Sequence, residues 1–592
     1  MHFLKKYWSL ILTIIVIWGI QIFVASLYTA NFDSDEAVWG LMAKHITDAN
    51  DWPIYYYGFS YLGSLEALVS AFLRWVFNHS SVFLFRFGSL IFYLGFLCTW
   101  AMLITKWFSR RIALMSLLFI SVPSTFLLIW TYRPIGAFSA WLCIGFLYIL
   151  LLYSPWQKFK AFRLVLLGLL LGLALWLHPM TVIFIGASLL PKLLSSKVFL
   201  SVYQRSQQNK YVAILLKLLF LLSLGLAAIL FFSSGCHGVV WIIIKYLVLF
   251  LWLLAILILL SANLGLVLTW LRCQWKQIVC LCLGSLLGGF PILVYINQNW
   301  KFPSTAILAS CPTGIPRRLG VITMQIFPVL FGTEVEWWHD MRILLALFLT
   351  LVGIVSLIYF FYHHKKAVVN SFLLEPVSKE KTSFLVVSWL FILPIVFAAL
   401  GNNTFDYASS RYLILTWLAC SVFFGIFLEW IKSKFVRGSC LIAILSIHVF
   451  SLVNYTLAQY QIITRYDDHY LGRLEEVLDE NGLNALWADY WLSYNLDYLF
   501  NERILFVPSN GVNRIPEYVA QISSQNRVGM IFWNDDRAAT FSTLDELTPI
   551  LLRRSVYGGP LRTEVSTILG NYHKADILHV GHWIIWVLEK NN

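Results

Sequence analysis

The sequence predicts a polytopic α-helical membrane protein of about 13 transmembrane helices, followed by a C-terminal soluble α/β domain. Of its 592 residues, 59% are hydrophobic and only 12% are charged, whereas soluble domains carry about 25% charged residues. Apolar runs recur along the first part of the chain and are separated by short basic segments. Beyond residue 460 the runs become shorter and the charged residues more frequent. We therefore expect a transmembrane domain at 1–460 and an α/β domain at 461–592.

The excess of basic residues, 43 Lys and Arg against 30 Asp and Glu, does not point to nucleic acid. In a membrane protein such an excess usually marks cytoplasmic loops. The nine cysteines show neither metal-binding spacing nor a disulfide framework. The partner that the composition predicts is the lipid bilayer.

The first element is the apolar run Ser9–Tyr28, which follows Lys5 and Lys6. A signal peptide has a shorter apolar core of about 7–15 residues, so we expect this run to remain as a membrane anchor. The positive-inside rule then places the N-terminus in the cytoplasm and the next segment on the far side.

That next segment carries the three carboxylates Asp33, Asp35 and Glu36 within four residues. Apolar residues recur at helical spacing after them, which predicts an amphipathic helix at 35–48 lying in the membrane interface. Acids in a first helical turn are common and favourable, so capping is the ordinary explanation. A second interfacial helix is expected at 62–78, after an aromatic stretch.

Twelve further spans follow, with the basic loops consistently on the cytoplasmic side. One run of 32 residues, Val239–Trp270, is taken as a single tilted span, since a hairpin there would place Arg272 and Lys276 outside. The spans are Val82–Thr105, Ile112–Thr131, Ile135–Tyr153, Leu164–Leu177, Met180–Leu190, Tyr211–Phe232, Val239–Trp270, Gln277–Ile296, Arg342–Tyr362, Phe384–Leu400, Tyr412–Trp430 and Leu441–Ala458.

The odd number of spans places the C-terminal domain outside the cytoplasm. It begins with a charged helix at Gly472–Asn481. Short runs of apolar residues bounded by turn residues then predict strands. These strands are Ala485–Ala488, Arg503–Pro508, Val528–Trp533 and His582–Glu589.

Under this topology, acidic and basic residues gather at the outer ends of the spans. Arginine is well suited to bind a lipid phosphate, and a carboxylate can take a proton from an attacking hydroxyl. Together they predict lipid-phosphate-linked sugar transfer. Each residue also has an ordinary interpretation, as an interface anchor, a solvated loop residue or a helix break. The candidate catalytic residues are Asp35, Asp33 and Glu66; the candidate substrate-binding residues are Glu36, Tyr57, Arg133, His178, Arg317, Arg411 and Tyr412.

The sequence gives little support for a dedicated metal site, because the histidines lack ligand spacing. Asp35 and Glu66 remain candidates to share a divalent metal ion. The chain has no Gly-rich phosphate loop with a Lys, which argues against an ATP-driven pump.

Several motifs resemble those of the GT-C membrane glycosyltransferases. Asp35-Glu36-Ala37 follows the first span, as the acidic first-loop motif does in that superfamily. The resemblance is closest to the branch with the lipid A aminoarabinose transferases, the protein O-mannosyltransferases and the Rgt-like bacterial enzymes. It is strongest over residues 30–195 and includes segments that begin at Tyr57, Lys106, Arg133, Trp176, Arg411 and Trp487.

The resemblance implies that Asp35 is the catalytic base, with Asp33 as its competitor. Glu66 lies in the loop of the family's second acid, although its local motif differs. Arg411-Tyr412-Leu413 is similar to a family Arg-Tyr-Leu-Leu-Pro pattern but lacks the proline. The implied function is inverting transfer of a sugar from a polyprenyl-phosphate donor to a glycan, lipid or protein hydroxyl. The resemblance also implies that the reaction takes place at the outer face of a bacterial inner membrane. The alternatives are a lipid-linked polysaccharide polymerase or ligase, and a non-enzymatic lipid-sugar transporter.

Overall fold

The computed structural model describes the chain in segments and divides it into two compact units. Unit 1 comprises Met1–Gly19, Phe92–Trp130 and Trp141–Val453, and unit 2 comprises Ile20–Ile91, Thr131–Ala140 and Asn454–Asn592. Five of the described helices run from one unit into the other: α1 (His2–Leu27), α4 (Val82–Trp107), α6 (Thr125–Tyr132), α7 (Phe138–Leu152) and α20 (Lys434–Ile463). The described residues are 2–27, 33–121, 125–154, 160–196, 200–201, 204, 264–299, 315–330, 341–373, 375–400, 411–463, 468–533 and 563–591.

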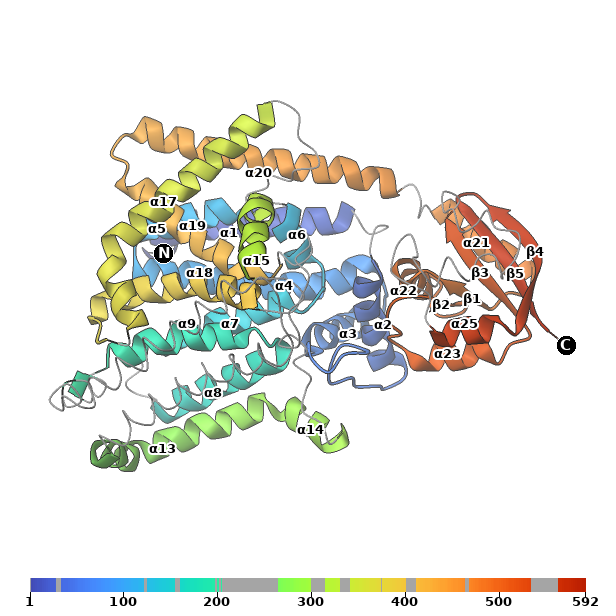
Figure 1. The fold of residues 1–592 in the computed structure, drawn as a ribbon, viewed down its shortest axis with the longest axis horizontal. Coiled ribbons are helices and arrows are strands. Elements are labelled where there is room, and N and C mark those ends of the chain that lie inside the picture. The colour runs from blue at the N-terminus through green and yellow to red at the C-terminus, as the bar shows by residue number, and fades with distance from the viewer. Residues whose placement is uncertain are drawn as a thin grey trace. The chain divides into compact units, whose positions relative to one another are not determined.

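The described part of unit 1 is built almost entirely from helices (Figure 1). Within the described residues, five helices are long and apolar enough to cross a membrane, or six if one bent pair is a single span. The protein is therefore a multi-pass membrane protein. Its helices include α5 (Arg110–Ser121), α6 (Thr125–Tyr132), α7 (Phe138–Leu152), α8 (Lys160–Leu177), α9 (Thr181–Leu194), α13 (Leu264–Gly288), α14 (Phe290–Asn299), α15 (Ile315–Val321), α16 (Phe327–Leu330), α17 (Met341–Phe372), α18 (Thr382–Leu400), α19 (Ile414–Trp430) and α20 (Lys434–Ile463).

The structure corrects several predicted boundaries; for example, α17 continues past the predicted span end at Tyr362 to Phe372. The sequence-based topology ends a span at Trp270 and starts the next at Gln277, with Arg272 and Lys276 in a basic loop between them. Instead, α13 continues unbroken through both cations and ends at Gly288, where it meets α14 at an angle of 60°. Lys and Arg are good helix formers, so two isolated cations do not end a helix. The predicted span Tyr211–Phe232 and most of Val239–Trp270 lie outside the described residues.

Helices α8 and α13 approach each other through glycines. A Cβ atom added at Gly168 would lie 2.1 Å from the carbonyl oxygen of Leu281, and one at Gly284 would lie 2.0 Å from that of Val165. Gly172 and Gly288 are equally close to the opposite backbone. Small residues allow this close contact between helices in membranes. Helix association there depends on van der Waals packing, because the lipid provides no hydrophobic driving force between helices.

We expect Gly284→Ala to destabilise this helix pair, because the new methyl group collides with a backbone atom that has no freedom to move aside. Overpacking costs about 2 kcal/mol or more, which exceeds the helix-propensity gain of about 1 kcal/mol for Ala over Gly. The measurement is the thermal unfolding midpoint in detergent. Gly438→Ala is the control, since its Cβ meets nothing within 4 Å. Equal midpoints for the two variants would contradict the expected packing.

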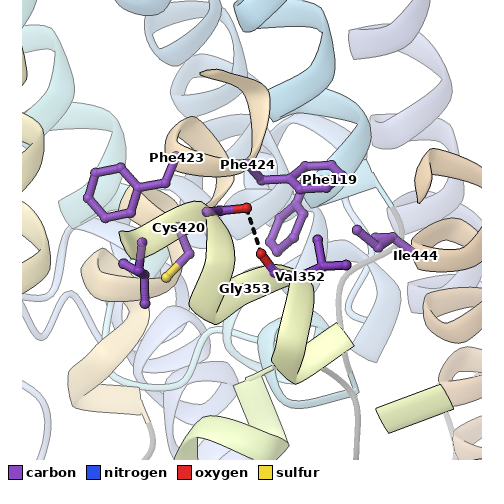
Figure 2. A pocket seen from close by; sticks show the side chains of 9 residues that line it. Phe119, Val352, Gly353, Cys420, Phe423, Phe424 and Ile444 are labelled. Atoms are coloured by element: carbon purple, nitrogen blue, oxygen red, sulfur yellow. Dashed lines mark hydrogen bonds between the residues drawn. The ribbon is translucent and has the colours of Figure 1, made fainter. Parts of the chain in front are cut away.

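Unit 1 also contains an apolar pocket lined by α5, α17, α19 and α20 (Figure 2). Its polar atoms are few, and the hydroxyl of Ser356 donates to the carbonyl of Val352 at 2.7 Å. The lining residues are Phe119, Val352, Gly353, Ser356, Leu357, Cys420, Phe423, Phe424 and Ile444.

Unit 2 combines the two short helices α2 (Ser34–Asp48) and α3 (Leu65–Phe77) with the C-terminal part of the chain. Within the described residues, its sheet has five strands in the order β2-β1-β3-β5-β4. Strand β1 pairs in parallel with β2 and β3, while β5 pairs antiparallel with β3 and β4. The strands are β1 (Ala485–Ala488), β2 (Leu505–Pro508), β3 (Arg527–Trp533), β4 (Tyr572–Val580) and β5 (Trp583–Lys590), and the neighbouring helices are α21 (Asp468–Glu480), α22 (Tyr490–Leu499), α23 (Pro516–Ser523) and α25 (Thr563–Leu569).

Four of the five strands lie where the sequence predicts them. Strand β4 is the exception, and its residues explain why. It is an edge strand in which most side chains are exposed or half-buried, so it includes His573, Lys574, Asp576 and His579. An exposed edge strand needs no apolar alternation, and the sequence signal for a strand is then absent.

Candidate active site

The three carboxylates of the first loop sit at the start of α2, where the helix begins at Ser34. Asp33 is the N-cap, and one of its oxygens, Oδ1, accepts a hydrogen bond from the backbone N–H of Glu36 at 2.9 Å. Its other oxygen, Oδ2, pairs with Nη2 of Arg133 at 2.6 Å. Both oxygens of Asp33 are therefore occupied by groups of the protein itself.

Glu36 is fully buried between two arginines. Arg86 approaches it with Nε at 2.5 Å and Nη2 at 3.0 Å, a bidentate pair in which both side chains are fully buried. Arg133 adds a third contact, from its Nε to Oε2 at 2.7 Å. Burial acts to raise the pKa of Glu36, but the two guanidinium groups outweigh it, so the carboxyl pKa is lowered and the group stays ionised.

Asp35 differs from its two neighbours because its carboxylate is held at only one oxygen. Oδ1 accepts a short hydrogen bond from the Tyr490 hydroxyl, and lies 3.4 Å from both the Tyr56 hydroxyl and Nη2 of Arg514. Among the described residues Oδ2 has no partner, and the side chain is 31% exposed. Asp35 is therefore fixed in place with one oxygen open to an incoming group.

Two of the groups that hold Asp35 belong to the C-terminal part of the chain, and sequence reasoning did not single them out for this role. Tyr490 begins α22, and Arg514 precedes α23. Burial raises the pKa of the Tyr490 hydroxyl well above its ordinary value, so it remains a hydrogen-bond donor toward Asp35. The Arg514 guanidinium is buried and lies 4.0 Å from the centre of the Phe59 ring. The only signal in the sequence was that each of these polar residues lies in a segment that follows a strand, β1 or β2. Segments of this kind commonly carry functional side chains.

Glu66 lies on α3 and is fully enclosed. Its Oε2 accepts from the Ser89 hydroxyl at 2.6 Å, and its Oε1 accepts from the backbone N–H of Ala140 at 2.9 Å. Burial raises the pKa of Glu66 to about 7, although both hydrogen bonds act in the opposite direction. The carboxyl therefore joins α3, α4 and the start of α7.

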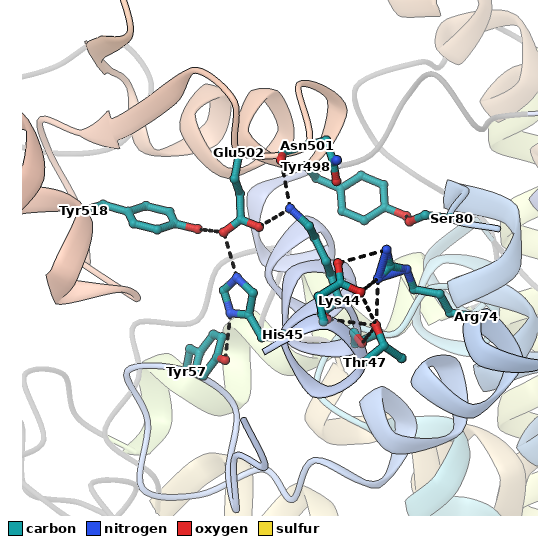
Figure 3. A network of polar contacts seen from close by, with 12 residues as sticks. Lys44, His45, Thr47, Tyr57, Arg74, Ser80, Tyr498, Asn501, Glu502 and Tyr518 are labelled. Carbon is teal, nitrogen blue, oxygen red and sulfur yellow. Dashed lines mark hydrogen bonds and ion pairs between the residues drawn. The ribbon is translucent and has the colours of Figure 1, made fainter. Parts of the chain in front are cut away.

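The far end of α2 is joined to the C-terminal domain by a polar network (Figure 3). Glu502 accepts from Lys44 at 2.5 Å and contacts His45 at 2.7 Å, and it also accepts from Tyr518. His45 in turn contacts the Tyr57 hydroxyl at 2.9 Å. Tyr57, a candidate substrate-binding residue, therefore takes part in a network that fixes α2 against the residues after α22.

We expect this network to stabilise the protein at neutral pH and to fail in acid. Burial acts to raise the pKa of Glu502, but hydrogen bonds from His45, Lys44 and Tyr518 outweigh it and lower the pKa to about 2. In the unfolded chain, a Glu carboxyl has a pKa of about 4.3. The stabilisation is therefore complete above that pH and is lost as the pH falls toward 2.

The variant Glu502→Gln should lower the free energy of unfolding at pH 7 by about 2–3 kcal/mol. The measurement is the unfolding midpoint against pH for the wild type and the variant, which should converge only as the pH falls to about 2. Glu475→Gln is the matched control, because Glu475 pairs with Arg503 at an exposed site where both side chains are over 40% accessible. A wild-type-like curve for Glu502→Gln would show that the network contributes no stability.

The remaining candidate residues belong to unit 1. His178 is buried between α8 and α9, where its Nδ1 accepts from the backbone N–H of Met180 at 3.1 Å. Arg317 is exposed on α15, whereas its neighbour Arg318 is buried. Arg411 lies half-buried before α19, with its guanidinium 5.0 Å from the centre of the Trp130 ring and 5.2 Å from that of Tyr412.

The two carboxylates suggested for a shared metal ion have different hydrogen-bond partners. Asp35 contacts Tyr490, Tyr56 and Arg514, while Glu66 contacts Ser89 and the backbone of Ala140. In the part of the chain that the structure describes, no group of three or more His, Cys, Asp or Glu side chains is arranged to hold a metal ion.

No family model and no curated protein matches this sequence. Among solved structures, the chain is similar to ArnT from Cupriavidus metallidurans bound to undecaprenyl phosphate, at 10% identity and a TM-score of 0.48, over 99% of this chain and 98% of that one. It is also similar to the archaeal oligosaccharyltransferase AglB from Archaeoglobus fulgidus in complex with an inhibitory peptide and a dolichol-phosphate. That match has 12% identity and a TM-score of 0.46, over 89% of this chain and 70% of AglB. These similarities concern the course of the chain alone.

Proposed function

We propose that this protein is a membrane glycosyltransferase that moves a sugar from a polyprenyl-phosphate donor to an acceptor hydroxyl, with Asp35 as the general base. The observation that carries the proposal is the contact set of Asp35. Of the three first-loop carboxylates, Asp33 and Glu36 have both oxygens occupied by neighbouring groups, whereas Asp35 has one oxygen held and one open. A general base needs this combination of fixed orientation and access.

In the proposed reaction, Oδ2 of Asp35 takes the proton of the acceptor hydroxyl as the acceptor oxygen attacks the anomeric carbon. The bond between that carbon and the donor phosphate oxygen breaks, and its electron pair leaves with the polyprenyl phosphate. Attack and departure occur on opposite faces of the sugar, so the anomeric configuration is inverted. The reaction balances without another reactant.

Tyr490, Tyr56 and Arg514 would act by positioning the base. The two hydroxyls and the guanidinium all approach Oδ1, which leaves the lone pairs of Oδ2 for the acceptor. Because burial raises the pKa of both tyrosines, they remain protonated and cannot compete with Asp35 for the proton. Through Tyr490 and Arg514, the C-terminal domain would contribute directly to the site rather than only guiding the acceptor.

The departing lipid phosphate requires cationic partners, for which we propose Arg411, assisted by Arg317 and Arg133. Arg411 has the best support in its contacts, since its guanidinium lies against two aromatic rings. Within the described part of the chain, its one hydrogen bond is a long one, to the Tyr412 hydroxyl at 3.5 Å. Arg133 is committed to Asp33 and Glu36, so a phosphate would have to share it with these acids. Tyr412 would orient Arg411. The structure of the site would then be supported by Glu36, Glu66, Tyr57 and His178.

We place the reaction at the outer face of a bacterial inner membrane, with a glycan, lipid or protein as acceptor. The proposed reaction assigns no step to a metal ion. The dependence of transfer on a divalent ion is tested by measuring transfer in the presence of EDTA and again after Mg²⁺ or Mn²⁺ is added back.

The proposal is tested by mass spectrometry of the lipid-linked sugars in the source organism. We expect a strain that lacks the protein to accumulate one polyprenyl-monophosphate sugar, and the wild-type gene to restore the normal pool. Accumulation of an oligosaccharide on a polyprenyl diphosphate would instead indicate a polymerase or ligase. An unchanged pool would contradict the proposed function.

A further inference from the structure

In unit 1, three basic side chains from three different helices converge on the C-terminal end of α7. Lys106 lies at the end of α4, Arg163 in the first turn of α8 and Lys192 near the end of α9. They contact the last backbone carbonyls of α7 and the residue that follows it. None of them belongs to the site around Asp35.

The contacts are short and specific. Lys106 donates to the carbonyl of Tyr153 at 2.8 Å. Arg163 donates to the carbonyl of Leu151 at 2.9 Å and to that of Leu152 at 3.0 Å. Lys192 donates to the same Leu152 oxygen at 2.8 Å. Two cationic groups therefore share one carbonyl oxygen, which puts their nitrogen atoms no more than about 6 Å apart.

The charges at this point do not balance. A helix C-terminus supplies the equivalent of about half a negative charge, whereas three full positive charges gather on it. Lys379 adds a further positive charge near Lys192. Among the described residues, no carboxylate forms an ion pair with Lys106, Arg163 or Lys192. An anion would relieve the repulsion between these cations.

The surroundings indicate which kind of anion. The aromatic rings of Trp107 and Tyr153 meet edge to face here, with centroids 5.4 Å apart, and Lys192 lies 4.7 Å above the Tyr153 ring. Trp and Tyr concentrate at the level of the lipid headgroups, where the ends of membrane helices meet water. Arg binds phosphate oxygens in a bidentate manner, and Lys adds a point charge.

We propose that Lys106, Arg163 and Lys192 form a binding site for a phosphate group, that of an anionic lipid headgroup. This basic cluster holds the phosphate at the C-terminal end of α7 and thereby joins α4, α7, α8 and α9 through one bound lipid. Free inorganic phosphate shares the chemistry and is the other source that the experiment separates.

The test is native mass spectrometry of the full-length protein in detergent, titrated with phosphatidylglycerol or with phosphatidylcholine. The wild type should retain at least one phosphatidylglycerol in preference to phosphatidylcholine. Arg163→Gln/Lys192→Gln should reduce that preference by about 30-fold, because each basic residue contributes about 1 kcal/mol toward an anionic lipid. The matched control is Lys365→Gln/Lys366→Gln, which removes the same charge from exposed positions on α17.

Inorganic phosphate is added alone in a second arm, with the unfolding midpoint as readout. If phosphate stabilises the wild type but not the Arg163/Lys192 variant, and also displaces phosphatidylglycerol, the cluster binds phosphate from either source. If phosphate has no effect while phosphatidylglycerol retention depends on the cluster, the occupant is the lipid. Equal retention in wild type and variant, or an equal loss in the Lys365/Lys366 control, overturns the proposal. Size-exclusion profiles establish that both variants are folded.

Discussion

Replacing Asp35 by Asn is expected to reduce glycosyl transfer by about 10²–10⁴-fold, the contribution of a general base, while leaving the protein folded. The Asn side chain keeps the shape of Asp and can still accept from Tyr490 at one atom. It has no basic oxygen to take the acceptor proton. The measurement is transfer by purified protein supplied with the polyprenyl-phosphate sugar identified in the lipid pool, together with complementation of the strain that lacks the protein.

Asp33→Asn is the matched control, since it removes the same charge two residues away. Asp33 caps α2 and pairs with Arg133, so its loss should lower the unfolding midpoint and have a smaller effect on turnover. Normal turnover in a folded Asp35→Asn variant would remove Asp35 from the mechanism. Loss of turnover confined to Asp33→Asn would move the base to that residue.

The second large effect is expected for Glu36→Gln, which should destabilise the protein by about 3–5 kcal/mol. The substitution preserves volume but leaves the fully buried Arg86 without its bidentate partner and deprives Arg133 of one of its two acids. A buried charge without compensation is much more costly than the same loss at the surface. The measurement is the unfolding midpoint in detergent and the yield of folded protein.

Asp48→Asn supplies the comparison on the same helix. Asp48 also pairs with an arginine, Arg74, but its side chain is 46% exposed, and exposed pairs contribute about 1 kcal/mol or less. The double variant Glu36→Gln/Arg86→Met should recover part of the lost stability, because it removes the uncompensated charge. Similar midpoints for Glu36→Gln and Asp48→Asn would show that the Glu36 cluster does not stabilise the fold.

Local features of the chain were predictable because their causes are local. Strand β1 coincides with the predicted Ala485–Ala488, since a short apolar run bounded by turn residues is enough to specify a buried strand. Helix α2 was visible in the spacing of its apolar residues and in its acidic first turn. The edge strand β4 and the unbroken course of α13 were not, because neither produces a distinctive local pattern.

The sequence alone determined that this is a multi-pass membrane protein with a C-terminal sheet, and that acids follow its first apolar helix. Only the tertiary structure decided which of those acids is open. That depends on Arg86, a buried cation near the start of the apolar helix α4, and on Tyr490 and Arg514, which lie 455 and 479 residues from Asp35 in the sequence. Periodicity and composition report on neighbours along the chain, whereas the state of a carboxylate is set by whichever charges and hydroxyls folding brings against it.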